Sequence, residues 1–318
     1  MRKKRLYRLG TCVVDDAFFH FHSLFKDLGY DVVQNSYTRA ATSVFSNLLD
    51  KPGPMAERLH DEMHSTMQKN VTKRNWRESH YAVWLQYNAI VRLHSIDTLF
   101  PDVGPDDVLI MDCHGDLYSK YDDGKDSFGI YPAWPQITQH FPSWLVEKIN
   151  TFPTYKADMI SMEQVKRRHS KLQAFAELIF KKFNNNVIIL DKAFTNKLYV
   201  EDLGPGEQLS CNLLNVEIPF ITVDEKGFET QVNLPYLHRL YDGYARAVKR
   251  ARPYWRFVSF ENDACYADPN HRFGPHPTHL HPTSWEQLRM QFISALTELS
   301  NQVNIVEDED HPMIVVNY

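Results

Sequence analysis

Four consecutive apolar residues, Val108-Leu109-Ile110-Met111, lie between Asp107 and Asp112. A strand with one face in water alternates apolar and polar residues, so an unbroken apolar run indicates a strand that is buried on both faces. Strands of this kind belong to parallel sheets whose two faces are covered by helices. The run therefore predicts an α/β fold.

Shorter apolar segments alternate with helical patterns along the rest of the chain, as a doubly wound sheet requires. Further strands are expected at residues 6–9, 30–34, 187–190 and 256–260. Helices are expected at residues 17–28, 54–68, 79–94, 161–183 and 235–250, and a last helix is expected from near Ser284. We therefore expect a three-layer α/β sandwich with a flavodoxin-like parallel sheet of about five strands.

The 318 residues are expected to form a single α/β domain with insertions. A helical insertion is expected over about 51–105. The segment over about 113–160 is rich in Tyr, Trp, Asp, Gly and Pro and is too long for an ordinary connection, so it is expected to be an aromatic-rich loop that covers the site. A β-hairpin outside the parallel sheet is expected at about 212–233.

Composition excludes several classes of protein. The net charge of −5 argues against a general nucleic-acid binder, because phosphate contacts need a basic surface. The four cysteines are scattered without a Cys-x-x-Cys pair, which favours a reducing compartment over a disulfide framework. No long apolar run follows the basic start at residues 1–5, so we expect a cytoplasmic protein without an integral membrane segment.

Gly10-Thr11-Cys12 forms the predicted turn between the first strand and the first helix. In an open α/β sheet this turn lies at the carboxyl edge of the sheet, where ligands bind. A helix amino terminus favours the thiolate form of a cysteine, so Cys12 is a candidate nucleophile. The alternative is that Cys12 is a buried and inert cysteine.

The loop before the last helix contains four candidate general bases: His271, His276, His279 and His281. This loop follows the carboxyl end of a predicted strand, so one of these side chains can supply a base to Cys12. The alternatives are a metal site built from the same four histidines and a histidine-rich surface loop. Zinc ligands usually have a regular short spacing, which these histidines lack, so no metal is expected.

These residues give the chain a resemblance to the SGNH (GDSL-like) hydrolase superfamily. In that superfamily a turn after the first strand carries the nucleophile, and a histidine shortly before the last helix acts as base. The chain is most similar to a bacterial SGNH-like family of capsule and surface-polysaccharide loci, whose members begin with a Gly-Ser-Cys turn and end with His-aromatic-Gly and Pro-x-His segments. The corresponding residues here are Gly10-Thr11-Cys12, His271-Arg272-Phe273-Gly274 and Pro277-Thr278-His279.

The resemblance implies that Cys12 is the nucleophile, as in the similar capsule acetyltransferases of the WcbI type, which use coenzyme A. Family spacing makes His279 the first choice as base and His281 the second. A literal copy of the superfamily's Asp-x-x-His, from Asp268 to His271, lies earlier in the loop. Thr11 stands where the nearer family has Ser, so the Thr11 hydroxyl stays open as an alternative nucleophile to the Cys12 thiol.

The predicted reaction is the transfer of an acyl group, from a coenzyme A thioester to a sugar hydroxyl of a surface or capsular polysaccharide. Backbone N–H groups near Thr11, Arg39 and Ala41 are expected to form an oxyanion hole, and Asp112 and His114 are expected to contact substrate. Two alternatives stay open. One is an SGNH-type esterase that acts on a carbohydrate or a lipid, and the other is a non-catalytic binding protein in glycan assembly.

Overall fold

The structure of the protein is a computed structural model. It describes residues 2–33, 96–112, 120–122, 129–130, 143–144, 147, 154–155, 162–191, 195, 197–199, 209–210, 221–223, 229–231, 234–260, 265–271 and 278–302. The helices expected at 54–68 and 79–94 lie outside these residues. So do the predicted site residues Arg39, Ala41 and His114.

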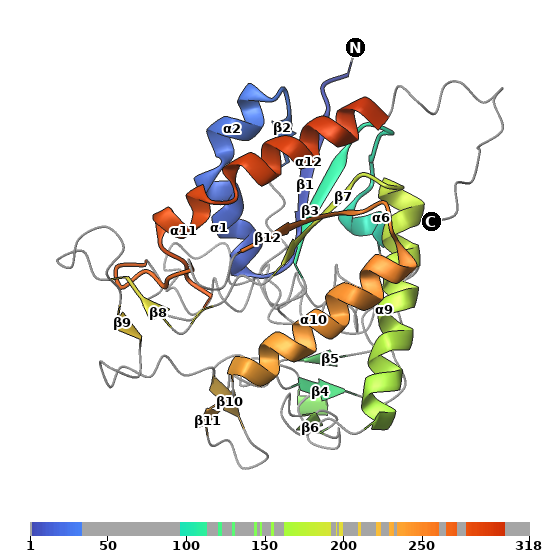
Figure 1. The fold of residues 1–318 in the computed structure, drawn as a ribbon. Helices are drawn as coiled ribbons and strands as arrows, with labels where there is room; N and C mark the ends of the chain where they lie inside the picture. Colours follow the sequence, from blue (N-terminus) through green and yellow to red (C-terminus); the bar gives the residue numbers. More distant parts are fainter. Residues whose placement is uncertain are drawn as a thin grey trace, which may run out of the picture.

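A five-stranded parallel sheet forms the centre of the protein (Figure 1). Its order is β12-β7-β3-β1-β2, and each neighbouring pair runs parallel. The strands are β1 (Arg5–Leu9), β2 (Asp31–Val32), β3 (Val108–Met111), β7 (Val187–Asp191) and β12 (Arg256–Ser259). This order is that of the flavodoxin-like sheet, so the predicted fold class is confirmed.

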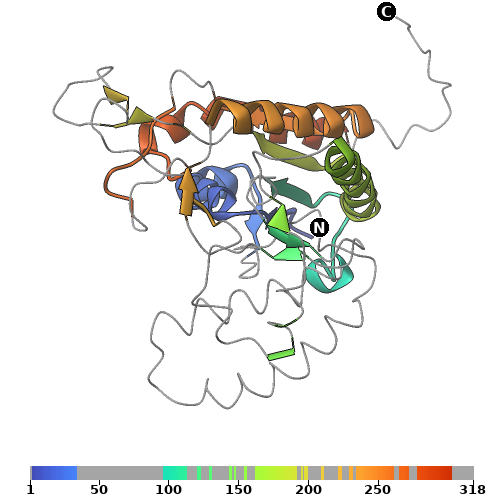
Figure 2. The same ribbon diagram turned by 90° about the horizontal axis from the view of Figure 1, so that it is seen from below.

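Helices cover both faces of the sheet, which gives three layers (Figures 1 and 2). One face carries α1 (Cys12–His20), α2 (His22–Asp27), α11 (Pro282–Glu286) and α12 (Arg289–Gln302). The other face carries α6 (Ile96–Leu99), α9 (Met162–Phe183) and α10 (Leu234–Ala251). Among the described residues, no helix combines the length and the apolar character needed to span a bilayer.

The apolar run of β3 fills both cores, as its composition predicts. Leu109 and Met111 pack with α9 and α10, whereas Val108 and Ile110 pack with α1 and α12. All four side chains are buried, because successive residues of a strand point to opposite faces of the sheet. The first and last helices of the chain therefore lie together on one face.

Two of the expected helices differ from the structure at their ends. The first helix begins at Cys12 rather than at Ala17, because Thr11 caps it, and it is divided at Phe21 into α1 and α2. The last helix begins at Pro282 and is divided by a turn at residues 287–288 into α11 and α12. The earlier start of α1 places Cys12 inside the first turn of a helix.

The insertions contain short strands. Within 113–160, which was expected to be a loop, β4 (Lys120–Asp122), β5 (Gly129–Ile130) and β6 (Thr154–Tyr155) form a three-stranded antiparallel sheet. The expected hairpin is present as β10 (Ile221–Val223) and β11 (Glu229–Gln231). A further antiparallel pair, β8 (Lys197–Leu198) and β9 (Leu209–Ser210), was not expected from the sequence.

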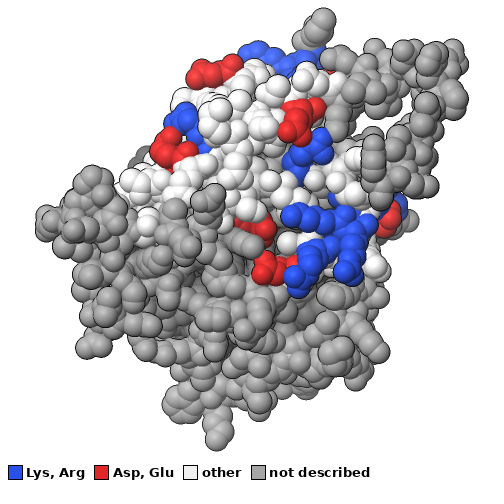
Figure 3. All heavy atoms as spheres, in the orientation of Figure 1, with Lys and Arg blue, Asp and Glu red and all other residues white. Residues whose placement is uncertain are grey.

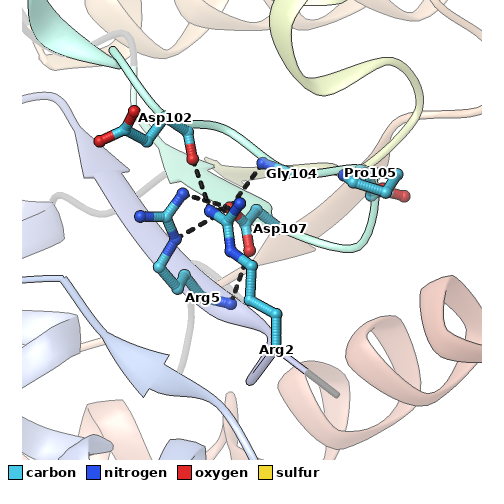
Figure 4. Close-up of polar contacts among 7 residues, drawn as sticks. Arg2, Arg5, Asp102, Gly104, Pro105 and Asp107 are labelled. Carbon is cyan, nitrogen blue, oxygen red and sulfur yellow. Dashed lines mark hydrogen bonds and ion pairs between the residues drawn. The ribbon is translucent and has the colours of Figure 1, made fainter.

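The buried carboxylate of Asp107 joins β1 to β3 at their amino-terminal ends (Figure 4). It accepts hydrogen bonds from the backbone N–H of Arg5 at 2.9 Å and from that of Gly104 at 2.8 Å. The Arg5 guanidinium approaches one carboxylate oxygen through Nε at 3.0 Å and Nη2 at 2.9 Å, and Arg2 reaches the same oxygen at 3.1 Å. This cluster fixes the edge of the sheet opposite the site described below.

Lys and Arg side chains gather on the surface over α10 (Figure 3). Lys249 and Arg250 occupy the last turn of this helix, where cations interact favourably with the helix dipole. Lys249 Nζ also lies 4.4 Å from the centre of the Phe257 ring of β12. Part of the basic surface therefore consists of the last turn of α10.

Candidate active site

The candidate site lies at the carboxyl ends of β1 and β3. After β1 the chain adds β2 at one edge of the sheet, and after β3 it adds β7 and then β12 toward the other edge. The strand order therefore reverses between β1 and β3. Ligands of open α/β sheets bind in the crevice at such a point. The turn Gly10–Cys12 follows β1, and Asp112 follows β3.

Asp112 anchors the turn between β1 and α1. Its fully buried carboxylate accepts hydrogen bonds through Oδ2 from the N–H of Thr11 at 2.9 Å, the hydroxyl of Thr11 at 2.9 Å and the N–H of Val14 at 3.3 Å. A Cβ on Gly10 would lie 2.6 Å from Oδ2, and the φ of Gly10 is +154°, so only glycine fits here without strain. The described contacts of Asp112 give it a structural role, and its contact with substrate stays a prediction.

Thr11 is the amino-terminal cap of α1. Its hydroxyl donates to Asp112 and accepts a hydrogen bond from the N–H of Val13 at 3.3 Å. A hydroxyl with both functions is available from Ser or Thr alike, so either residue could cap α1 in this way. To bind an oxyanion, the N–H of Thr11 would have to break its hydrogen bond to Asp112. The contribution of Thr11 to an oxyanion hole stays a prediction.

Cys12 is the first residue of α1, directly after the cap. Its side chain lies outside the described part of the structure. The positive end of the helix dipole stabilises an anion in this first turn. Asp15, also in the first turn, is paired with Arg8 of β1, whose Nη1 lies 3.1 Å from Asp15 Oδ1.

Two segments of the histidine-rich loop lie side by side. Ala267 and Leu280 form an antiparallel bridge, and the N–H of Asp268 donates to the carbonyl of His279 at 2.8 Å. This pairing stacks the rings of His271 and His279, with centroids 4.1 Å apart and an interplanar angle of 20°. His279 is buried, and the side chain of His271 is 9% exposed.

His271 contacts α1 through Asp16. Its Nε2 lies 3.2 Å from Asp16 Oδ2, and the Asp16 side chain is only 4% exposed. Asp16 follows Cys12 by four positions, so both residues lie on one face of α1, one turn apart. The structure thus brings the carboxyl-terminal histidines to the helix that Cys12 begins, while a direct contact between Cys12 and a histidine stays a prediction.

Asp16 was not among the site residues expected from the sequence. The signal available was its spacing of four from Cys12 on a predicted helix face, which became visible only once α1 was known to begin at Cys12. Asp268, the carboxylate of the literal Asp-x-x-His, instead accepts a hydrogen bond from the N–H of Asn270 at 2.8 Å. Its carbonyl accepts from the N–H of His271 at 3.4 Å, so the described contacts of Asp268 shape the turn that carries His271.

His281 caps α11. Its Nδ1 accepts a hydrogen bond from the N–H of Thr283 at 3.3 Å and lies 2.9 Å from the Thr283 hydroxyl. Its ring stacks on Tyr199 with centroids 3.8 Å apart. These contacts commit one ring nitrogen of His281 to the helix terminus.

A fourth histidine, His20, lies at the carboxyl-terminal end of α1. Its ring stacks on Trp285 with centroids 5.5 Å apart. Burial lowers the pKa of His20, and the nearby carboxylates of Asp16 and Glu286 oppose this effect. His20 is therefore less protonated than an ordinary histidine at the same pH.

The predicted metal alternative finds no support among the described residues, since none of their His, Cys, Asp and Glu side chains form a group of three that could hold a metal ion. His276 lies outside the described residues.

Comparison with known proteins gives no family for this chain: no family model, no curated protein and no solved structure matches it.

Proposed function

We propose that the protein is an O-acyltransferase in which Cys12 is the nucleophile and the stacked pair His271 and His279 supplies the base. The observation that carries the proposal is the contact of His271 with Asp16, one turn after Cys12 on α1. A thiol at a helix amino terminus next to imidazole is the arrangement that activates cysteine for attack on a carbonyl.

The reaction has two steps. The Cys12 thiol gives its proton to the histidine, and Sγ forms a bond to the carbonyl carbon of an acyl thioester while the bond from that carbon to the donor sulfur breaks. The donor sulfur leaves as a thiol with the proton from the imidazolium. A sugar hydroxyl then attacks the acyl-Cys12 carbonyl, its oxygen forms the new ester bond, the bond to Sγ breaks, and the histidine carries the hydroxyl proton to the cysteine sulfur.

The donor and acceptor follow from the resemblance. Acetyl-coenzyme A is the proposed donor, and a sugar hydroxyl of a surface or capsular polysaccharide is the proposed acceptor. Acyl transfer requires that water be kept from the acyl-enzyme. The insertion at 113–160, with its small sheet β4-β5-β6, is the segment that we expect to exclude water.

Incubation of the protein with acetyl-coenzyme A, followed by intact-protein mass spectrometry, tests the proposal. We expect one added acetyl mass in the wild type and none in Cys12→Ala, because a methyl side chain cannot form the thioester. Cys265→Ala is the matched control, since Cys265 is fully buried, and it is expected to retain the acetyl mass.

The two other classes of function give different results. Hydrolysis of simple aryl esters that depends on Cys12, with no adduct from acetyl-coenzyme A, would identify an esterase. An absence of both reactions, together with normal function of Cys12→Ala in the native host, would leave a glycan-binding protein as the better account.

A further inference from the structure

We propose that the carboxyl-terminal half of α10 binds the surface of a membrane that contains anionic lipids. The residues that bind are Arg246, Lys249 and Arg250, which together are called the α10 cation cluster, and the exposed Tyr254 that follows them. The surface over α10 on which Lys and Arg side chains gather is seen in Figure 3.

The α10 cation cluster lies on the exposed side of its helix. Lys249 and Arg250 follow Arg246 by three and four positions, a spacing that places the three side chains next to one another on one helix face. Tyr244 and Val248, on the other side of the helix, are buried in the core. The core thus supports a helix that carries three positive charges side by side in solvent.

These three charges are not neutralised within the described part of the chain. The two cations that follow α10 are each paired with a carboxylate: Arg252 with Glu177 and Arg256 with Glu298. No member of the α10 cation cluster forms an ion pair with a residue that the structure describes.

The stability of α10 does not account for the whole cluster. Lys249 and Arg250 lie in the last turn, where the helix dipole favours cations, but Arg246 lies before that turn. Like charges one turn apart, such as those of Arg246 and Arg250, destabilise a helix. The nearest acidic residue of the helix in sequence is Asp242, one turn before Arg246. The cluster is therefore better explained by an anionic partner than by the helix itself.

Tyr254 adds an exposed aromatic residue four positions after the cluster. It belongs to the turn that joins α10 to β12, in which the N–H of Trp255 donates to the carbonyl of Arg252 at 3.2 Å. Trp255 is buried and donates from its indole to the carbonyl of Asn184 at 3.0 Å, which fixes the turn, whereas Tyr254 is 58% exposed. An apolar ring with a polar hydroxyl is suited to the boundary between lipid headgroups and acyl chains.

Three cations and an aromatic ring fit a lipid surface better than a nucleic acid. A nucleic acid held by three phosphate contacts binds weakly at physiological salt, and the net charge of −5 weakens it further. Near an anionic bilayer each Lys or Arg strengthens binding about fivefold, and an aromatic ring supplies a second contribution that salt does not screen.

The position of the cluster is compatible with the candidate active site. Since α10 leads into the amino-terminal end of β12, its last turn lies toward the edge of the sheet opposite the carboxyl ends of β1 and β3 (Figure 1). The cluster can therefore contact a bilayer without covering the candidate site.

Co-sedimentation of the full-length protein with lipid vesicles tests the proposal. We expect binding to vesicles of phosphatidylcholine and phosphatidylglycerol in equal amounts, little binding to phosphatidylcholine alone, and weaker binding as salt screens the charges. Arg246→Gln, Lys249→Gln and Arg250→Gln are each expected to weaken binding about fivefold, and the triple variant about a hundredfold. Tyr254→Ala is expected to weaken binding by a factor that does not change with salt, because burial of an apolar ring is not screened.

Lys26→Gln is the matched control, because Lys26 is an exposed cation of α2, which covers the other face of the sheet. This variant loses the same charge and should bind vesicles like the wild type. Equal weakening in Lys26→Gln and Arg250→Gln would overturn the proposal, because net charge alone would then control binding. Equal binding of the wild type to both kinds of vesicle, or to neither, would also overturn it.

Two further results would assign the cluster to another partner and so overturn the proposal. Binding to polygalacturonate but not to vesicles would indicate an acidic glycan. Loss of vesicle binding on addition of inorganic phosphate at constant ionic strength would indicate a site for free phosphate. Vesicle binding needs no acyl donor, so each of these results is independent of the proposed acyl transfer.

Discussion

Replacement of Asp112 with alanine is expected to lower the free energy of unfolding by about 4 kcal/mol. The buried carboxylate accepts three hydrogen bonds from the turn that follows β1, and its removal leaves those donors without this acceptor in a dry site. Each buried donor left unsatisfied costs about 1–3 kcal/mol, and partial entry of water reduces the sum. Urea denaturation followed by circular dichroism measures the change.

Asp27→Ala is the matched control for this variant, because Asp27 is an exposed aspartate at the end of α2, and its loss is expected to change stability by less than about 0.5 kcal/mol. Asp112→Asn keeps the shape of the side chain and one acceptor oxygen, so its expected cost lies between the two. A cost below about 1 kcal/mol for Asp112→Ala would mean that the turn does not depend on the carboxylate.

Replacement of Asp107 with alanine is expected to be about as costly, at roughly 3–5 kcal/mol. Its carboxylate is 2% exposed and accepts from two backbone N–H groups and from the guanidinium of Arg5, so its loss leaves a partly buried positive charge without a counter-ion. Arg2→Ala should cost less than about 1 kcal/mol, because the Arg2 side chain is 53% exposed and its ion pair is screened by solvent.

Thermal and urea unfolding of Asp107→Ala and of Asp102→Ala provide the comparison. Asp102 is exposed and contributes its backbone carbonyl to Arg2, which an alanine retains, so this variant should unfold like the wild type. Equal stabilities for the two variants would show that the Asp107 carboxylate does not stabilise the junction of β1 and β3.

The central sheet could be predicted because its signals are local. Buried strands in a parallel sheet consist of apolar runs, and Val108–Met111 and Val187–Asp191 are such runs between turns. The order of the strands followed from the alternation with helices. The small sheet β4-β5-β6 was missed because strands of two or three residues carry too few positions for a pattern of period two.

The site could be predicted only in part, because its parts meet through tertiary contacts. Cys12 was predicted to lie within reach of His271, His279 or His281, because both segments follow strands of one sheet. The structure brings His271 to Asp16 on the helix that Cys12 begins, and the contact with Cys12 itself stays a prediction. Which carboxylate lies next to the His271 ring could not be predicted, since Asp268 is close to His271 in sequence whereas Asp16 is close to it in space. His281 was the second choice as base after His279, and its role as a helix cap became visible only in the structure.

The central claim is that a histidine activates Cys12, and the rate at which iodoacetamide alkylates Cys12 tests this most directly. The rate is read from the peptide that contains Cys12, in the wild type and in His271→Gln, between pH 6 and pH 10, with His22→Gln on the exposed face of α2 as control. The account predicts that the wild type and the control react about tenfold faster than His271→Gln near neutral pH, and that all rates converge at high pH, where the thiol is ionised without help. Equal rates for wild type and His271→Gln at every pH would contradict it.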